Sequence, residues 1–94
     1  MWESSMARFE INSAEVAAMG HQAITADVFF RMGVDHSIGR GVAADMIAAH
    51  KWFNLAAAQG NVEAARWRQE ISQEMSVAEI AEAQRQAREW MTRH

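Results

Sequence analysis

Residues Gly39 to Gly60 have the sequence GRGVAADMIAAHKWFNLAAAQG, with a pair of glycines at its start and one glycine at its end. Glycine readily adopts the left-handed backbone conformation that closes a helix. We therefore expect Gly39 or Gly41 to end a preceding helix and Gly60 to end the following one. Asp45 is expected to cap the start of the helix between them, because its carboxylate accepts backbone N–H groups there.

The helix predicted before this turn spans residues 26 to 38, with Thr25 as its cap. It carries two apolar stripes, one formed by Phe29, Met32, Gly33 and His36 and the other by Phe30, Val34 and Ile38. A helix that is apolar on two faces is either sandwiched between neighbours or has one face open to a partner.

Gly33 lies in the middle of this predicted helix, where glycine costs about 1 kcal/mol relative to alanine. That cost suggests a close helix crossing that a Cβ atom would obstruct. The following helix offers the small residues Ala49 and Ala56 on one face, with Trp52 beside them. We therefore expect the two helices to form an antiparallel hairpin.

The rest of the chain is also expected to be helical, because alanine is abundant and proline is absent. Residues 1–24 are predicted as a weakly helical segment that stops near Gly20. Asn61 is expected to cap a helix over residues 61–75, and the sequence from Ser76 to Glu79 is a capping box that starts a last helix. The sequence thus predicts one all-α domain without an internal linker.

These motifs together resemble one full Sel1-like repeat, a helix-turn-helix relative of the tetratricopeptide repeat. The resemblance is carried by Gly33, Gly39, Gly41, Asp45, Ala49, Trp52, Ala56 and Gly60. His36 stands where the family usually has a tyrosine. On this resemblance, residues 25–60 form the repeat hairpin and residues 61–94 form a divergent half-repeat with a C-terminal capping helix. The implied architecture is a short α-solenoid of antiparallel helical hairpins.

Sel1-like proteins serve as scaffolds and adaptors, so the resemblance implies a protein–protein interaction module with no catalysis of its own. The first helix of each hairpin lines the concave face in such architectures, which makes the partner-binding candidates Asp27, Phe30, Arg31, Val34 and Ile38. The alternative is that residues 1–24 fold back and bury this stripe. Two other functions remain open: a homo-oligomer, such as a homodimer, that stacks hairpins between copies, and a regulatory domain of an enzyme complex.

The residue spacing gives no support for a catalytic or metal site. No two acidic residues form a pair in an apolar context, as general acid–base chemistry needs. The histidines form neither an i, i+4 pair nor a His-Glu-x-x-His run; they are His21, His36, His50 and His94. We interpret His36 as a packing residue and His50, beside Lys51, as a surface residue. We expect no enzyme activity, no cofactor and no metal.

Composition and charge also argue against nucleic acid and membranes as partners. The net charge is −3, and the C-terminal arginines are interleaved with Glu79, Glu82 and Glu89, which indicates a solvated helix face. No apolar stretch approaches the roughly 20 residues of a membrane span. The first ten residues lack the basic start and apolar run of a signal peptide. Since cysteine is absent, we expect a cytoplasmic protein.

Overall fold

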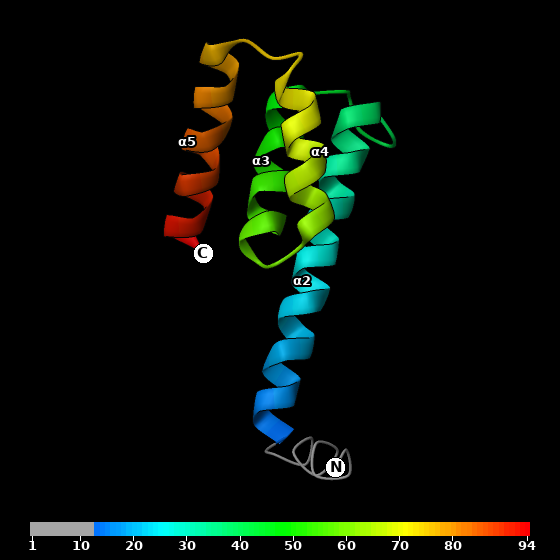
Figure 1. The fold of residues 1–94 in the computed structure, drawn as a ribbon, viewed down its shortest axis with the longest axis vertical. Helices are drawn as coiled ribbons and strands as arrows, with labels where there is room; N and C mark the ends of the chain where they lie inside the picture. The colour runs from blue at the N-terminus through cyan, green and yellow to red at the C-terminus, as the bar shows by residue number, and fades with distance from the viewer. Residues whose placement is uncertain (1–12) are drawn as a thin grey trace, which may run out of the picture.

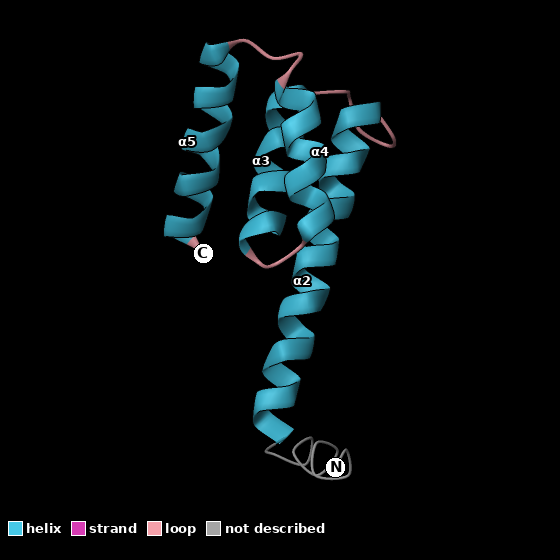
Figure 2. Ribbon diagram, in the orientation of Figure 1, coloured by secondary structure: helices cyan, strands magenta, loops and turns pink. Residues whose placement is uncertain are grey.

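The structure is a computed structural model that describes the backbone of residues 13–94 and the side chains of residues 25–94. The described part of the chain is made of helices joined by short turns (Figure 2). These helices are α2 (Ser13–Ile38), α3 (Met46–Ala58), α4 (Val62–Ser72) and α5 (Val77–Arg93). Successive helices run in opposite directions, and no strand occurs within residues 13–94, so the predicted all-α class is confirmed (Figure 1).

The helix α2 is longer than predicted, because it runs without a break from Ser13 to Ile38. The predictions that Gly20 stops a helix and that Thr25 caps a new one were therefore wrong. A helical glycine costs only about 1 kcal/mol relative to alanine, and the residues on both sides of Gly20 include good helix formers. No local signal is strong enough to break the helix there.

The N-terminal half of α2 projects beyond the other helices (Figure 1). Because residues 13–24 continue α2 in the same direction, they do not fold back over the stripe formed by Phe30, Val34 and Ile38. The alternative in which this segment buries the stripe is therefore wrong for residues 13–24. Its remaining part, residues 1–12, lies outside the described residues.

The glycine turn between α2 and α3 closes one helix and starts the next. Both Gly39 and Gly41 have left-handed backbones, with φ of 78° and 76°. The N–H groups of Gly39 and Arg40 donate to the carbonyl oxygen of Asp35 at 2.8 and 2.9 Å. The bond from Gly39 is that of an αL helix end, and the bond from Arg40 is the longer one of a Schellman end. Asp45 then caps α3 as predicted, its carboxylate accepting the Ala48 N–H at 3.1 Å.

The close crossing predicted at Gly33 is present between α2 and α3. A Cβ atom built on Gly33 would lie 2.5 Å from two ring atoms of Phe53, a side chain that is 0% exposed. The small residues predicted to permit this approach, Ala49 and Ala56, are fully buried. Only glycine fits at this position without displacing the Phe53 ring of the facing helix.

The end of α3 and the starts of α4 and α5 carry the predicted local signals. Gly60, with φ of 103°, closes α3, and Asn61 caps α4 by accepting the Ala64 N–H at 2.8 Å. Ser76 and Glu79 form the predicted capping box at the start of α5. The helix α4 ends at Ser72 rather than at residue 75, because residues 73–75 tighten into turns bonded three residues back.

Two groups of aromatic rings hold the four helices together around α3, which contacts each of the others. The first aromatic trio is Phe29, Trp52 and Trp90, which join α2, α3 and α5. The second aromatic trio is Phe30, Phe53 and Trp67, which join α2, α3 and α4. Every pair within a trio has its ring centroids between 5.2 and 5.9 Å apart, which is the favourable range for aromatic contacts.

The trios explain why α2 is apolar on two faces. Phe29 and Phe30 are adjacent in α2, and Trp52 and Phe53 are adjacent in α3, so each helix sends one ring to each side of the hairpin. The helix α5 closes one side and α4 closes the other. At Phe29 and Phe30, α2 is therefore sandwiched between its neighbours. The stripe formed by Phe30, Val34 and Ile38 is more open toward its C-terminal end, where Val34 is half-buried and Ile38 is exposed.

Candidate partner-binding surface

One side of α2 carries a shallow groove that contains four of the five predicted partner-binding residues. Its volume is about 320 Å³, and it is lined by Asp27, Phe30, Arg31, Val34, Asp35 and Arg40. The structure thus brings Asp27, Phe30, Arg31 and Val34 together. The fifth predicted residue, Ile38, is 57% exposed and lies outside the groove lining.

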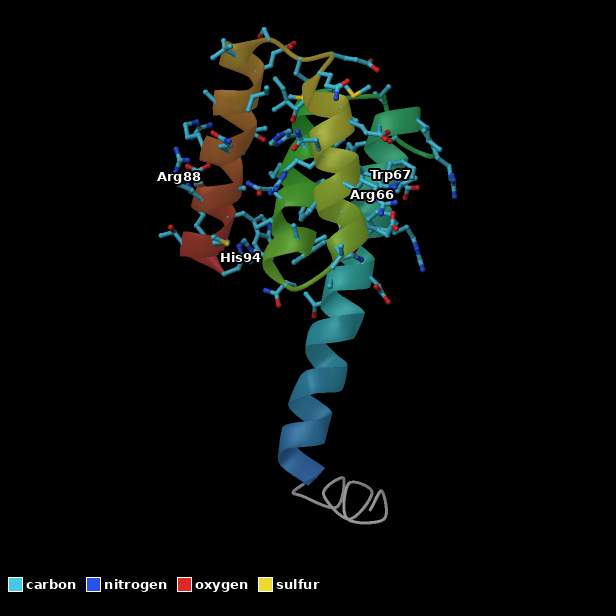
Figure 3. The ribbon with its side chains drawn as sticks, viewed as in Figure 1. Arg66, Trp67, Arg88 and His94 are labelled. Carbon is cyan, nitrogen blue, oxygen red and sulfur yellow. The ribbon has the colours of Figure 1, made fainter. Side chains whose placement is uncertain are left out.

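Phe30 forms part of the apolar floor of this groove and also packs against rings of the core. Its ring lies 5.7 Å from that of Phe53 and makes an edge-on contact, also at 5.7 Å, with Trp67 of α4. Figure 3 shows Trp67 on the side of α4 that faces α2. The expected open stripe is therefore half closed by α4, and Phe30 serves the core as well as the surface.

The charged side chains of the groove alternate in sign along α2. Asp27, Arg31 and Asp35 follow one another at intervals of one helical turn, and the first two are exposed. Neighbours four residues apart lie on the same face of a helix. The groove therefore presents a negative, a positive and a negative group in a row beside an apolar floor.

Asp35 and Arg40 were not among the predicted site residues, although the four-residue spacing from Arg31 to Asp35 was visible in the sequence. The Nε atom of Arg40 lies 3.8 Å from Oδ1 of Asp35, which is too long for a hydrogen bond. That Oδ1 atom is buried and accepts no hydrogen bond from the described residues. The Asp35 side chain as a whole is 29% exposed, so at the edge of the groove it presents its other atoms rather than this oxygen.

The histidines differ in how well the sequence predicted them. His36 is half-buried, and its Nδ1–H donates to the Met32 carbonyl oxygen at 2.9 Å, as expected of a packing residue. His50 is 2% exposed, so its interpretation as a surface residue was wrong. The neighbouring Lys51 is partly exposed, but adjacent residues of a helix point about 100° apart, and His50 faces α4.

His50 belongs to a polar seam between α3 and α4. The Ser72 hydroxyl donates to the Arg68 carbonyl oxygen at 2.7 Å, and the His50 Nε2–H therefore donates to Ser72 Oγ, 3.1 Å away. Arg68 also donates to the side-chain oxygen of Asn54 at 2.6 Å. Burial lowers the pKa of His50 below its usual 6.5, and the positive charge of Arg68 lowers it further. His50 is thereby held neutral inside the seam.

The described part of the chain, residues 13–94, shows no sign of a metal site or of a membrane span. Within it, no group of three or more His, Asp or Glu side chains converges as the ligands of a metal ion would. None of the described helices combines the length and the apolar character that a membrane crossing requires. Comparison of the sequence with protein-family models and curated proteins, and of the chain with solved structures, found no match.

Proposed function

We propose that this chain is a protein-interaction or scaffolding module of the Sel1-like type, without catalysis of its own, that works in the cytoplasm. The proposal is supported by the local roles of the residues that carry the resemblance. Gly33 permits the close crossing, Gly39 and Gly41 form the turn, and Asp45 and Gly60 bound the second helix. Such hairpins bury their remaining faces against neighbouring units.

The groove on α2 is the observation that carries the proposal. An apolar floor flanked by alternating charges suits an amphipathic segment of a partner, whose apolar side chains fill the groove and whose charges oppose those of α2. Phe30 and Val34 supply the floor, while Asp27 and Arg31 lie exposed at its edge. A partner helix with basic, acidic and basic residues on successive turns would complement the row from Asp27 to Asp35.

Site-specific cross-linking tests this proposal in the native host cell. A photo-reactive amino acid at Arg31 should trap a discrete protein partner, because this side chain is exposed at the groove edge. The same amino acid at Val62, which is 78% exposed on α4 and outside the groove lining, is the control. Equal cross-linking from both positions, or from neither, would remove the groove as the binding surface.

Charge reversal provides a second, independent measurement. In a protein that carries the photo-reactive residue at Val34, the variant Asp27→Lys should reduce the yield of the cross-linked species at least tenfold. Like charges opposed across an interface cost several kcal/mol, and about 1.4 kcal/mol is already a factor of ten. The matched control is Glu63→Lys on α4, which makes the same change of charge at an exposed site. Asp27→Lys should keep the Tm of the parent protein because its position is exposed, whereas Glu63→Lys should lower the Tm slightly because it places a positive charge in the first turn of α4.

A homo-oligomer is the second candidate function, and the projection of α2 favours it. Residues 13–24 extend beyond the body of the molecule (Figure 1), and an isolated helical segment of that length is marginal in water. A second copy of the chain that packed along this segment would stabilise it. Light scattering coupled to size-exclusion chromatography decides the matter, and a strict monomer at high micromolar concentration would exclude the oligomer.

A further inference from the structure

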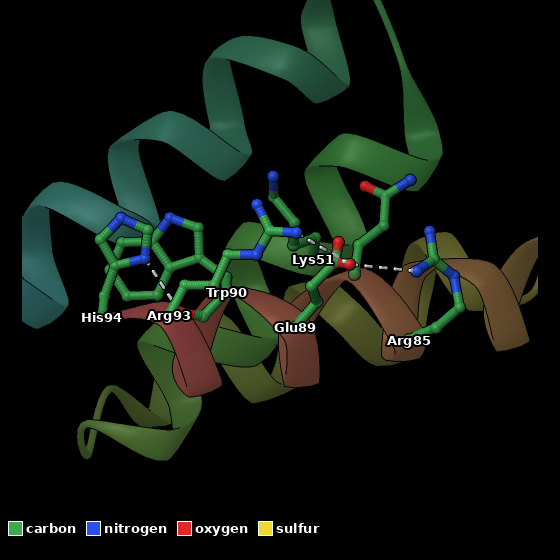
Figure 4. Close-up of a pocket in the computed structure, with 7 residues that line it drawn as sticks. Lys51, Arg85, Glu89, Trp90, Arg93 and His94 are labelled. Atoms are coloured by element: carbon green, nitrogen blue, oxygen red, sulfur yellow. Dashed lines mark hydrogen bonds and ion pairs between the residues drawn. The ribbon is translucent and has the colours of Figure 1, made fainter.

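A second surface feature lies between α3 and α5, on the side of the hairpin that holds the first aromatic trio. It is a pocket of about 270 Å³, which we call the basic pocket, and its charged lining consists of Lys51, Arg85, Glu89 and Arg93. Trp90 and His94 also line it, and Figure 4 shows these side chains converging from the two helices. The chain as a whole carries a net charge of −3, so a local excess of cations is notable.

The arginine at the far end of the pocket is already neutralised. Arg85 donates two hydrogen bonds to the carboxylate of Glu82, at 2.9 and 2.7 Å. These bonds, with one from Gln86, lower the pKa of Glu82 to about 2. Arg85 and Glu82 thus form a closed bidentate pair, and Arg85 is not available as a main anchor for a ligand.

Lys51 and Arg93 are the two cations of the pocket that lack a close hydrogen-bonded carboxylate of the kind that Arg85 has in Glu82. A single carboxylate oxygen, Oε2 of Glu89, lies 3.7 Å from Arg85 and 3.6 Å from Arg93. Both distances exceed the roughly 2.7–2.9 Å of a charge-assisted hydrogen bond. Lys51 makes no ion pair with the described residues, and its ammonium group lies 4.4 Å from the centroid of the Trp52 ring. Both cations therefore retain N–H groups that could donate hydrogen bonds to an anion.

The aromatic wall of the basic pocket is fixed from the core. The ring of Trp90 packs against Phe29 and Trp52, with centroids 5.2 and 5.9 Å away. The His94 imidazole stacks on Trp90 at 4.2 Å with an angle of 12° between the rings. The volume is slightly below the range of about 300–1,000 Å³ that is typical of sites for drug-sized ligands, so the pocket suits a small ligand.

We propose that the basic pocket binds a small oxyanion, a phosphate or carboxylate group, held by the ammonium of Lys51 and the guanidinium of Arg93. The planar fork of a guanidinium matches two oxygens of such a group, and a lysine adds a mobile point charge. Trp90 forms the wall behind the bound group. This site is distinct from the groove on α2, and neither proposal depends on the other.

The test is a titration of the isotope-labelled protein followed by NMR, with inorganic phosphate at pH 7.5 and chloride adjusted to keep the ionic strength constant. Saturable shifts at the amides of Lys51 and Arg93 and at the indole N–H of Trp90 are expected. A dissociation constant on the order of 1 mM corresponds to about −4 kcal/mol, which a few exposed charge-assisted bonds can supply. A parallel titration with acetate distinguishes carboxylate from phosphate.

Three variants sharpen the experiment. Lys51→Met keeps the aliphatic stem over Trp52, and Arg93→Gln keeps a polar side chain; each should weaken phosphate binding about tenfold, since a hydrogen bond to a charged group contributes about 1.5–3 kcal/mol. The control is Arg88→Gln, which removes the same charge from α5 on the side that faces away from α3 (Figure 3). This variant should bind phosphate like the parent protein.

Each outcome either supports or overturns the assignment. Saturation with both anions supports an oxyanion site of general kind, and saturation with phosphate alone assigns it to phosphate groups, whereas saturation with acetate alone assigns it to carboxylates. Shifts that grow linearly with either anion, or an equal loss in Arg88→Gln and Arg93→Gln, would mean that only the overall charge of α5 is sensed. That result would overturn the basic pocket as a binding site.

Discussion

Gly33→Ala is expected to destabilise the protein, although alanine is the better helix former. The added Cβ would lie 2.5 Å from two ring atoms of Phe53. Phe53 is 0% exposed, and its ring is held by Phe30 on one helix and Trp67 on another. The ring therefore cannot turn away without displacing the second aromatic trio.

The size of the effect follows from two opposing contributions. Overpacking a filled core costs about 1–3 kcal/mol, whereas replacing a helical glycine by alanine recovers about 1 kcal/mol. The net expectation is a loss of up to roughly 2 kcal/mol in the free energy of unfolding. In a domain of this size 1 kcal/mol corresponds to about 4–8 °C in Tm, so the Tm of Gly33→Ala should fall by up to roughly 15 °C. Gly33→Leu should lose several kcal/mol.

Urea unfolding followed by circular dichroism measures this loss directly. The matched control is Gly20→Ala, the same substitution in the part of α2 that projects beyond the other helices (Figure 1). There the midpoint should stay unchanged or rise, because only the gain in helix propensity applies. A second variant, Gly33→Ala with Phe53→Leu, should show a favourable coupling between the two positions. A Gly33→Ala protein that is more stable than the parent would refute the close crossing.

The remaining predictions concern polar groups and the groove. Because the pKa of His50 is lowered in the folded state, the unfolded chain takes up a proton there first as the pH falls below about 6.5, the value of a free histidine. The free energy of unfolding should therefore decrease below this pH and remain level above it, and His50→Gln should flatten the dependence measured by urea titration. Asp45→Ala should cost about 1 kcal/mol through loss of the cap on α3, whereas Asp27→Ala, at an exposed position that caps no helix, should leave the urea midpoint within about 0.5 kcal/mol. Phe30→Asp should unfold the protein in the same assay because it places a carboxylate beside buried rings, whereas Arg31→Glu should keep the Tm and alter only partner binding.

The sequence predicted the parts of the fold that depend on residues within about four positions of each other. The Asp45 and Asn61 caps, the Ser76 capping box and the left-handed glycines are such local features, and the structure confirms them. Gly33 was predicted as well, because a helical glycine without a local purpose indicates contact with another helix. The predicted helix end at Gly20 was wrong, because a cost of about 1 kcal/mol does not end a helix between good helix formers.

The features that could not be predicted from the sequence depend on which helix covers which face of its neighbour. The burial of His50 follows from α4 packing beside α3, with Ser72 Oγ placed to accept a hydrogen bond from its Nε2–H. The partial closure of the α2 stripe follows from Trp67 reaching Phe30. Both contacts join residues more than 20 positions apart, so no helical periodicity contains them. Four of the five partner-binding candidates line one groove and Ile38 lies outside it, and the sequence did not indicate that Phe30 also packs in the core.

The two proposed sites are connected to the core in the same way, which determines how variants should be interpreted. The second aromatic trio contributes Phe30 to the groove, and the first contributes Trp90 to the basic pocket. Each surface therefore has an aromatic wall that also holds a helix in place, and a rim of exposed charges that does not. Substitution of a ring changes stability and binding together, so it cannot separate the two. The rim residues are better probes of binding, because Asp27, Arg31 and Arg93 are exposed and Lys51→Met keeps the aliphatic stem beside Trp52.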